Sequence, residues 1–265
     1  MVEFTGDGVD DEDSAQYSAD AADLRAGIDD LAGLLAGSLG LPDLLSQVAA
    51  FTCRAIPGAD GASVTLLRSD PTDSGVAALA ASAPFVADID EIQYKTLGEG
   101  PGITAVRDLR PVRSGSLGGE KAWPRFGPRV GRMGVHSVLA LPLRVPDRVV
   151  GAISVYAHGK DTFDEHAEEL GELFAKPAAA AVHNAQVLAE ALALNVQLRK
   201  ALSSRPVIDQ AIGIIRGRTG RTADDAFAQL QSMSQSEHRK LADVAAHVVD
   251  EAVRRAAARN GRGAV

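Results

Sequence analysis

The feature that most constrains the fold is a change in hydrophobic period along the chain, from helical to strand-like and back again. From Ala21 onward, apolar residues recur at intervals of three and four, as at Leu24, Ile28 and Leu31. Four segments with strand character follow, and helical spacing returns after residue 162. This order predicts an α+β domain with an antiparallel sheet and flanking helices, followed by an all-α region.

The four strand-like segments form two pairs. Residues 62–67 (ASVTLL) and 76–83 (VAALAASA) are separated by a polar turn, and residues 136–145 and 148–157 by a short turn containing Pro-Asp-Arg, as in a hairpin. Residues 91–135, between the pairs, are rich in Gly and Pro, and we expect them to be irregular. Loops of that length inside a compact domain usually bind a ligand or carry function.

Composition narrows the class of protein. The 265 residues include one cysteine, Cys53, and no apolar run near the roughly 20 residues of a membrane span. The N-terminus lacks a signal-peptide pattern, and the six histidines are scattered. We therefore expect a cytoplasmic globular protein that does not enter a membrane and has no cysteine-built metal cluster, and no cofactor is predicted.

Charge is distributed unevenly along the chain. The net charge is −8, but residues 197–265 hold 12 Lys/Arg against 7 Asp/Glu, whereas residues 1–196 hold 15 against 28. A basic end on an acidic body suits a module that meets a polyanion, although ordinary surface variation would look the same. Residues 1–20 hold seven Asp/Glu, no Lys/Arg and few apolar side chains, so they are predicted to form a disordered tail.

A long helix is predicted over residues 162–202, with an imperfect heptad pattern whose later half is the better part. Two alternatives stay open: this helix pairs with a second copy of the chain, or it packs on its own domain. We favour pairing, in which a lone core asparagine would fix the register. The predicted dimerisation residues are Leu188, Ala191, Asn195, Leu198 and Leu202.

Three helices are predicted after residue 202. Pro206 suits a first helical turn, so we expect a kink or a new helix there, capped by Ser203 or Ser204. The second helix starts at Thr222 with a capping box, and the third starts near Ser236. The apolar faces expected to pack together are Val207, Ile208, Ala211, Ile212, Ile214 and Ile215, then Ala226, Phe227, Leu230 and Met233, then Leu241, Val244, Ala245, Val248, Val249 and Ala252.

Two basic residues, Arg239 and Lys240, are expected in the first turn of the third helix. The helix dipole disfavours cations there, so two cations beside free N–H groups predict a phosphate site. The alternative is that they simply pair with Glu237 or Asp243.

The order of helix, two strands, long loop, two strands and helix, together with four motifs, resembles a GAF domain of the bacterial signalling type. The motifs are YKTLGEGPG (94–102), RPVRSGSL (110–117), WPRFGPRVGRMGVHSVLALPL (123–143) and RVVGAISVYA (148–157). The resemblance implies a pocket between sheet and loops for an unidentified small molecule, with an empty scaffold as the alternative. Gly102 stands where related sequences often have Cys, so thiol sensing is not expected there. Trp123 would either line the pocket or belong to the core of the loop.

The C-terminal region resembles an ANTAR domain, the RNA-binding antitermination module of bacterial response regulators. The resemblance rests on ALSSRPVIDQAIGII (201–215), TADDAFAQLQSMSQ (222–235) and HRKLADVAAHVV (238–249). Ile212 and Arg216 depart from the family pattern, which usually has Lys and Met there, so the contacts with RNA are expected to differ in detail. The implied organisation is an acidic tail (1–20), a GAF sensor domain (21–188), an all-α three-helix ANTAR domain with its lead-in helix (189–256) and a second tail (257–265).

Together these resemblances imply a signal-responsive regulator that is not an enzyme. Two ANTAR modules in a homodimer would bind paired stem-loops in a nascent transcript and so prevent a terminator hairpin. The alternative is a dimeric signalling or scaffold protein whose C-terminal helices bind a protein partner, with a ligand-free GAF domain. A GAF-based enzyme is disfavoured because no set of His, acid and nucleophile stands out. The predicted RNA-binding residues are the cations Arg205, Arg216, Arg218, Arg239 and Lys240 for phosphates, Gln210, Ser234, Gln235 and Ser236 for base edges, and Gly213 for close approach.

Overall fold

The computed structural model describes residues 9–35, 39–68 and 75–260, apart from the side chains of residues 9–13, 34–35, 200–204 and 260. The chain divides into two compact units, Met1–Ala189 and Glu190–Val265. The long helix α6 (Glu165–Thr219) contributes residues to both units.

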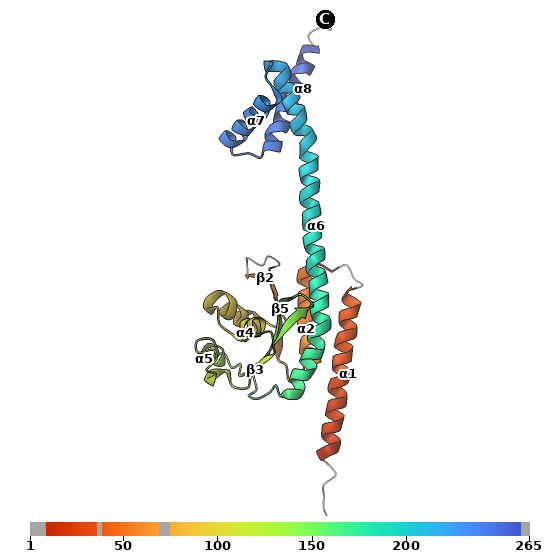
Figure 1. Ribbon diagram of the computed structural model, residues 1–265, viewed down its shortest axis with the longest axis vertical. Helices are drawn as coiled ribbons and strands as arrows, with labels where there is room; N and C mark the ends of the chain where they lie inside the picture. The colour runs from red at the N-terminus through yellow and green to blue at the C-terminus, as the bar shows by residue number, and fades with distance from the viewer. Residues whose placement is uncertain (1–8, 36–38, 69–74, 261–265) are drawn as a thin grey trace, which may run out of the picture. The chain divides into compact units, whose positions relative to one another are not determined.

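A five-stranded antiparallel sheet is the centre of the first unit, with strand order β2-β1-β5-β4-β3 (Figure 1). The strands are β1 (Gly61–Leu67), β2 (Val76–Ala81), β3 (Val112–Ser114), β4 (Ser137–Val145) and β5 (Arg148–Ala157). The helices besides α6 are α1 (Val9–Leu35), α2 (Leu41–Ala55), α3 (Pro84–Asp90), the π-helix η1 (Glu91–Leu97), α4 (Pro101–Asp108), the 3₁₀ turn η2 (Leu117–Gly119) and α5 (Phe126–Gly131).

Both predicted strand pairs are present. β1 pairs with β2, and β4 pairs with β5 in a tight hairpin that sets Val145 opposite Arg148. Pro146 and Asp147 fill the turn, which suits them because Pro fixes φ and Asp stabilises turns through its side chain. The α+β prediction is confirmed, but β3 was not predicted, because an edge strand of three residues has no detectable alternation.

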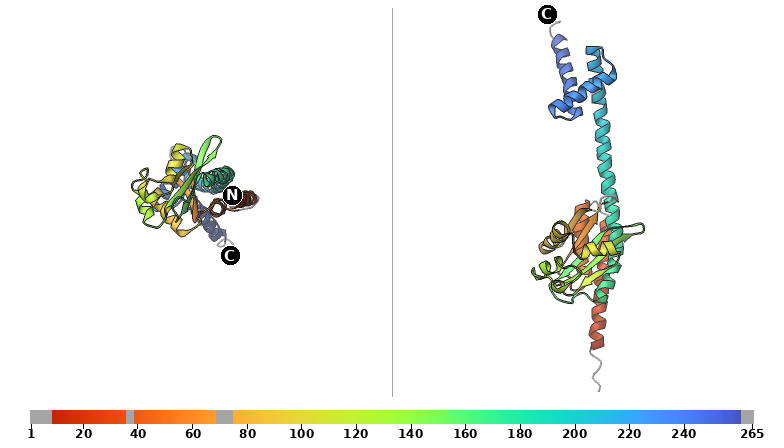
Figure 2. Two further views of the ribbon diagram at one scale, coloured as in Figure 1. Left: turned by 90° about the horizontal axis from the view of Figure 1, so that it is seen from below. Right: turned by 60° about the vertical axis from the view of Figure 1, so that its left-hand side comes forward.

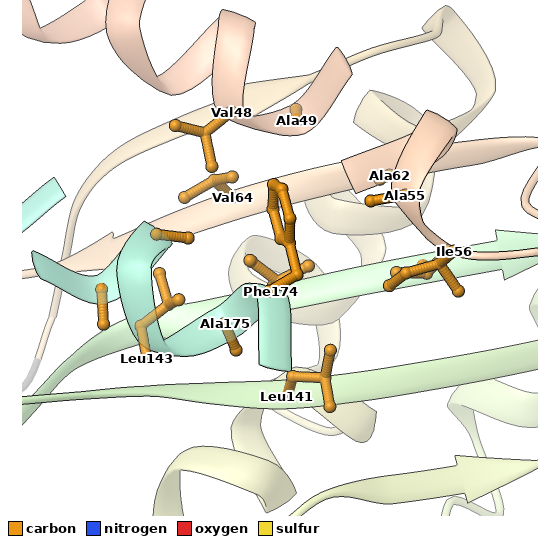
Figure 3. Close-up of a cluster of buried hydrophobic side chains, with 14 of the residues drawn as sticks. Val48, Ala49, Ala55, Ile56, Ala62, Val64, Leu141, Leu143, Phe174 and Ala175 are labelled. Atoms are coloured by element: carbon orange, nitrogen blue, oxygen red, sulfur yellow. The ribbon is translucent and has the colours of Figure 1, made fainter. Parts of the chain in front are cut away.

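Helices cover both faces of the sheet (Figure 2). On one face, α1, α2 and α6 enclose the main core, in which Val48 of α2, Val64 of β1 and Phe174 of α6 meet (Figure 3). Phe174 is completely buried. Because side chains alternate along a strand, the residues next to Val64 in the sequence face the other side of the sheet.

That other face is covered by the segment that was predicted to be irregular. Residues 91–135 contain η1, α4, β3, η2 and α5, and their apolar side chains form a second core around Trp123 and Phe126. The prediction of an irregular loop is therefore wrong. Gly98, in the left-handed region at φ 61°, ends η1, and Pro101 begins α4, so Gly and Pro mark helix ends here rather than a loop.

The prediction of a disordered tail is wrong for residues 9–20, which form the beginning of α1; residues 1–8 lie outside the described residues. Asp20 is buried: it accepts a hydrogen bond from Gln16 at 2.8 Å and lies 3.2 Å from His166 Nε2 of α6. The ring of Tyr17 stacks edge-on against His166. An acidic segment folds here because it continues a helix whose apolar part is anchored in the main core.

The second unit is all-α and consists of the C-terminal part of α6, α7 (Ala223–Glu237) and α8 (Leu241–Asn260). Its core joins three of the predicted apolar faces, with Ala211, Leu230 and Val244 buried. Phe227 was predicted to face this core, but 37% of it is exposed. Its neighbour in the sequence, Ala226, takes the core position, and one residue further along a helix points about 100° away.

Of the two alternatives expected at Pro206, the new helix start is wrong, and the kink stays a prediction. α6 continues through this residue, so Ser203 and Ser204 lie inside a helix and are not caps. Proline has no N–H, and the carbonyl of Leu202 therefore lacks its usual helical hydrogen bond. α8 in turn continues to Asn260, into the stretch predicted to be a tail.

Thr222 caps α7 as predicted. Its hydroxyl accepts from the Asp225 N–H at 3.2 Å, and the Asp225 carboxylate accepts from the Thr222 N–H at 3.4 Å. This reciprocal pair is a capping box, and it fixes where the second helix of the unit begins.

Candidate functional site

One exposed face of α6 in the second unit collects three of the predicted RNA-binding residues. At about 100° per residue, Arg205, Gly213 and Arg216 lie within roughly 80° of one another around the helix. All three are exposed, and a Cβ placed on Gly213 would meet nothing within 4 Å. We call these residues the α6 basic face. It presents two guanidinium groups with an open glycine between them along the helix.

Two other predicted residues lie on α6 but point elsewhere. Gln210 is exposed and about 60° from Gly213, so it borders the α6 basic face. Arg218 is exposed but roughly 160° from Arg216, so it does not belong to this face. The face also includes Asp209, an exposed carboxylate that reduces its net charge.

The remaining predicted residues surround the turn between α7 and α8. His238 ends α7 in the left-handed conformation, at φ 52°. The Lys240 carbonyl then accepts hydrogen bonds from N–H groups in the first turn of α8. The predicted helix start near Ser236 is therefore wrong, and Arg239 and Lys240 precede the third helix instead of lying in its first turn.

The two serines at this turn bond to the protein itself. Ser234 Oγ donates to the Arg239 carbonyl at 2.6 Å, and Ser236 Oγ donates to the Met233 carbonyl at 3.0 Å. Each hydroxyl has a single proton to donate, so both are limited to accepting from any further partner. Gln235 is exposed and keeps an amide that can both donate and accept.

Arg239 forms an ion pair with a neighbouring carboxylate. Its Nη1 lies 3.0 Å from Glu237 Oε2, which is one of the alternatives considered from the sequence. The predicted placement of both cations in the first turn of the third helix is wrong, while their binding of a phosphate stays a prediction. Lys240 is exposed. Since α7 has 15 residues and is about 22 Å long, this turn lies at the opposite end of the unit from the C-terminal end of α6 (Figure 1).

The predicted dimerisation residues lie on an exposed part of α6. Leu188 and Leu198 are 59% and 54% exposed, and Ala191 and Asn195 are exposed as well. The side chain of Leu202 lies outside the described residues. Earlier positions of the same heptad frame, such as Phe174, are buried in the first unit. The two alternatives for this helix thus apply to different parts of it: the earlier part packs on its own domain, and the later part presents apolar side chains to solvent.

Sequence reasoning missed the width of this apolar surface. Leu192, Leu194 and Val196 are also 55–65% exposed. With Leu188 and Leu198 they cover roughly 200° around the helix, which is much wider than a coiled-coil seam. A heptad frame scores only two positions in seven and could not find them.

A buried polar cluster lies in the first unit, on the sheet face opposite the main core. Ser63 and Thr65 alternate with the apolar residues of β1, and Ser154 of β5 lies opposite Ser63. Residues at the end of α3 and in η1 approach the same place from the other side. We define the polar cluster as Ser63, Thr65, Asp90, Gln93, Tyr94, Ser154 and Tyr156.

Each member of the polar cluster has a buried polar atom that lacks a hydrogen-bond partner among the described residues. Both carboxyl oxygens of Asp90 are in this state, although the side chain is fully buried. Burial raises the pKa of Asp90 to about 7, and the nearby Ser63 hydroxyl offsets part of the rise. Burial likewise raises the pKa of Tyr94 and of Tyr156. Buried groups of this kind require partners such as water or a ligand, because leaving one unpaired costs about 1–3 kcal/mol.

Two glycines bring the backbone close to this cluster. The Gly102 N–H donates to Gln93 Oε1 at 2.8 Å, and a Cβ on Gly102 would lie 2.4 Å from the Tyr94 hydroxyl. A Cβ on Gly100 would lie 2.3 Å from Gln93 Oε1. Gln93 and Tyr94, which these glycines approach, belong to the π-helix η1, and π-helical turns are found frequently at functional sites. Sequence reasoning missed the polar cluster. The signal that could have found it was the small polar residues Ser63 and Thr65 at alternate positions of β1, and Ser154 in β5.

Trp123 belongs to the second core rather than to the polar cluster. It is 3% exposed, packs edge-on against Phe126, and its indole N–H donates to Thr104 Oγ1 at 2.9 Å. Trp123 thus belongs to the core of the loop, and it also lines a hollow beside Arg107 and Arg113.

Comparison with known families assigns both units. A GAF domain model matches residues 38–183, more than half of the chain, and an ANTAR domain model matches residues 196–249. The chain belongs to the GAF domain family and carries a C-terminal ANTAR domain. The polar cluster lies within the GAF domain, and the α6 basic face lies within the ANTAR domain.

Solved structures share the GAF fold at low identity. The GAF domain of a phosphoenolpyruvate-protein phosphotransferase from Coxiella burnetii is 17% identical, with a TM-score of 0.50 over 63% of this chain and 96% of that one. The corresponding domain from Acinetobacter is 16% identical (TM-score 0.47; 63% and 97%), and a free methionine-R-sulfoxide reductase from Neisseria meningitidis is 15% identical (TM-score 0.45; 62% and 91%). No curated protein matches the chain. The first likeness supports the fold alone.

GAF and ANTAR domains are regulatory, and their combination supports a signal-sensing regulator of the antitermination family. Over the described residues, no helix is both long and apolar enough to cross a membrane. The same residues contain no group of three or more His, Cys, Asp or Glu side chains placed to hold a metal ion.

Proposed function

We propose that this protein is a signal-responsive RNA-binding regulator that promotes transcription antitermination by binding paired stem-loops in nascent RNA. The observation that carries the proposal is the α6 basic face inside the ANTAR domain, with Arg205 and Arg216 exposed on either side of the open Gly213. Holding two stem-loops together would keep the transcript from forming a competing terminator hairpin.

The chemistry of the α6 basic face suits an RNA stem-loop. Guanidinium groups bind phosphates in a bidentate manner, and the two are about 16 Å apart along the helix axis, so each reaches a different phosphate. Gly213 leaves room for the RNA backbone to approach. Gln210, at the border of the face, can donate to and accept from the edge of an unpaired loop base.

Two copies of the chain are part of the proposal, because paired stem-loops need paired ANTAR modules. The apolar surface of α6, from Leu188 to Leu198, is the segment through which the copies would associate. Monomeric proteins rarely expose so many large apolar side chains on one short helical stretch. Asn195 lies in this surface and would favour one register of the pair.

The GAF domain is the proposed sensor, with the polar cluster as its binding site for a small molecule. Its unpartnered hydroxyl, carboxyl and amide groups suit a polar ligand that makes several hydrogen bonds. The proposed role of such a ligand is to bias how α6 pairs between copies, and so how two ANTAR modules meet an RNA. No step of this proposal is catalytic.

The test is a titration of the full-length protein with an RNA of two stem-loops, beside the same RNA with its loop bases replaced. We expect binding that requires the loop bases. Arg205→Ala and Arg216→Ala should each weaken it by about 5- to 50-fold, and each should lower the salt slope by about 0.7–0.9, since each removes one phosphate contact.

Arg218→Ala is the matched control, because it removes the same charge from the same helix outside the α6 basic face. Equal losses for all three variants would mean nonspecific adhesion of a basic helix, and the proposed contact surface would be wrong. Binding to neither RNA, in the full chain and in a 188–265 fragment alike, would favour a dimeric scaffold that binds a protein partner.

A further inference from the structure

A surface hollow of about 480 Å³ lies in the GAF domain, where β4 begins and where η2, the end of α5 and the β5–α6 connection meet. Three basic side chains line it, Arg132, His136 and Lys160, together with the backbone of Gly118 and Gly119. We call it the basic hollow. It contains no residue of the polar cluster and lies outside the ANTAR domain.

The positive charge of the basic hollow is uncompensated. No carboxylate lines it, and Asp161, which follows Lys160 in sequence, is not among the lining residues. Among the described residues, Arg132 and Lys160 have no hydrogen-bond or ion-pair partner for their side chains. The hollow is thus a local basic site within residues 1–196, which carry a net charge of −13.

A second hollow in the same domain shows the opposite pattern. Its arginines, Arg107 and Arg113 among them, share the lining with three carboxylates, those of Asp108, Glu120 and Glu168. Arg107 Nε lies 2.7 Å from Asp108, and Arg113 Nε lies 2.9 Å from Glu168. The arginines of this second hollow thus have acidic partners, whereas Arg132 in the basic hollow has none among the described residues.

The main chain of Gly118 and Gly119 is exposed in the basic hollow. A Cβ on Gly118 or on Gly119 would meet nothing within 4 Å, so a ligand can reach the main chain there. Among the described residues, the Gly118 N–H has no hydrogen-bond partner. A guanidinium, an ammonium, an imidazole and a free N–H around one hollow form a set of donors that fits a phosphate group.

We propose that the basic hollow binds the phosphate group of a small phosphate-bearing molecule, at a site separate from the polar cluster and from the ANTAR domain. Arg132 supplies a bidentate fork and Lys160 a point charge. The basic groups converge on one hollow with room for one or two phosphates.

The test uses the full-length protein, labelled with nitrogen-15, in a buffer without phosphate. Inorganic phosphate, then pyrophosphate, is added at constant ionic strength, and the amide resonances of Gly118 and Gly119 are followed. We expect saturable shifts. Arg132→Ala and Lys160→Ala should each weaken binding by about 5- to 10-fold, because each removes a charge-assisted hydrogen bond. Both side chains are exposed, so both variants should fold.

Arg107→Ala is the control, since it removes another exposed arginine, from the compensated hollow, and should leave phosphate affinity unchanged. Absence of saturation by about 50 mM phosphate and pyrophosphate would overturn the proposal. An equal loss of phosphate affinity in Arg132→Ala, Lys160→Ala and Arg107→Ala would also overturn it. The last measurement is a titration with the two-stem-loop RNA, which Arg132→Ala should bind with the same affinity as the unaltered protein. An RNA loss as large as the phosphate loss would show that the hollow is part of an RNA surface instead.

Discussion

At the scale of single residues, the buried carboxyl group of Asp90 has the clearest chemical consequence in the GAF domain. Burial takes the Asp90 carboxyl group out of water and disfavours its charged form, which raises its pKa to about 7, and the nearby Ser63 hydroxyl offsets part of the rise. The unfolded chain releases the proton of this group near the ordinary value of 3.8. The native state therefore binds more protons between these two values, and stability falls as pH rises through that window.

Asp90→Asn should remove this pH dependence. Relative to the unaltered protein, the variant should gain about 1.4 kcal/mol of unfolding free energy per pH unit between pH 4 and 7, and nothing further above. Urea unfolding followed by the fluorescence of Trp123, the only tryptophan, reports on this domain. Parallel stability profiles for the two proteins would show that Asp90 ionises freely in the folded state.

Gly102→Ala should destabilise the GAF domain by about 1–3 kcal/mol, because a Cβ there lies 2.4 Å from the Tyr94 hydroxyl. The same fluorescence-detected unfolding measures the change. Gly33→Ala is the comparison: a Cβ on that helical glycine meets nothing within 4 Å, so the substitution should stabilise by up to about 1 kcal/mol. Similar losses in both variants would contradict the crowding described at Gly102.

At the scale of elements, local signals fixed some boundaries and tertiary packing fixed others. Thr222 and Asp225 form the capping box that their spacing predicts, because a capping box needs only residues that are neighbours in sequence. Of the two alternatives at Pro206, the new helix start is wrong, because α6 continues through this residue. The loss of one hydrogen bond is smaller than what this helix gains by burying Ala211 and Ile215 in the core of the ANTAR domain.

Thr222→Ala should weaken the start of α7 by about 1 kcal/mol, since it removes the acceptor for the Asp225 N–H. Hydrogen exchange at the amides of the first turn of α7 measures this locally, as about a fivefold loss of protection. Thr222→Ser keeps the hydroxyl and should retain most of the protection. If the serine variant exchanges as fast as the alanine variant, the cap does not hold this helix end.

At the scale of the whole molecule, the open question is what covers the apolar surface of α6. Leu188, Leu192, Leu194, Val196 and Leu198 are all more than half exposed. Burial of these side chains against a partner would be favourable because it removes their apolar surface from water. This is the physical reason to expect a second copy of the chain there. Their spread around the helix exceeds a two-helix seam, so the expected contact is broader than a simple coiled coil.

Leu188→Lys and Leu198→Lys should dissociate the homodimer, each weakening it by about 100-fold or more, because each places two charges in an apolar contact. Sedimentation equilibrium of the full chain measures the dissociation constant. Ala193→Lys adds the same charge at an exposed position roughly 140° from Leu188, and should have little effect. A protein that sediments as a monomer before any substitution would rule out this dimer.

The sequence by itself determined what depends on neighbours in the chain. Hydrophobic period predicted the α+β domain and the all-α end, the Pro-Asp turn predicted the β4–β5 hairpin, and the spacing of Thr222 and Asp225 predicted the start of α7. Separated motifs gave both domain families, because each motif keeps its residue types at fixed spacing.

Only the tertiary structure decided what depends on residues brought together from distant parts of the chain. It joined Ser63, Asp90 and Ser154 in one buried polar cluster, and it brought Arg132, His136 and Lys160 to one hollow whose lining includes no carboxylate. The reason is physical: burial and charge compensation are set by neighbours in space, and a sequence pattern records only neighbours along the chain.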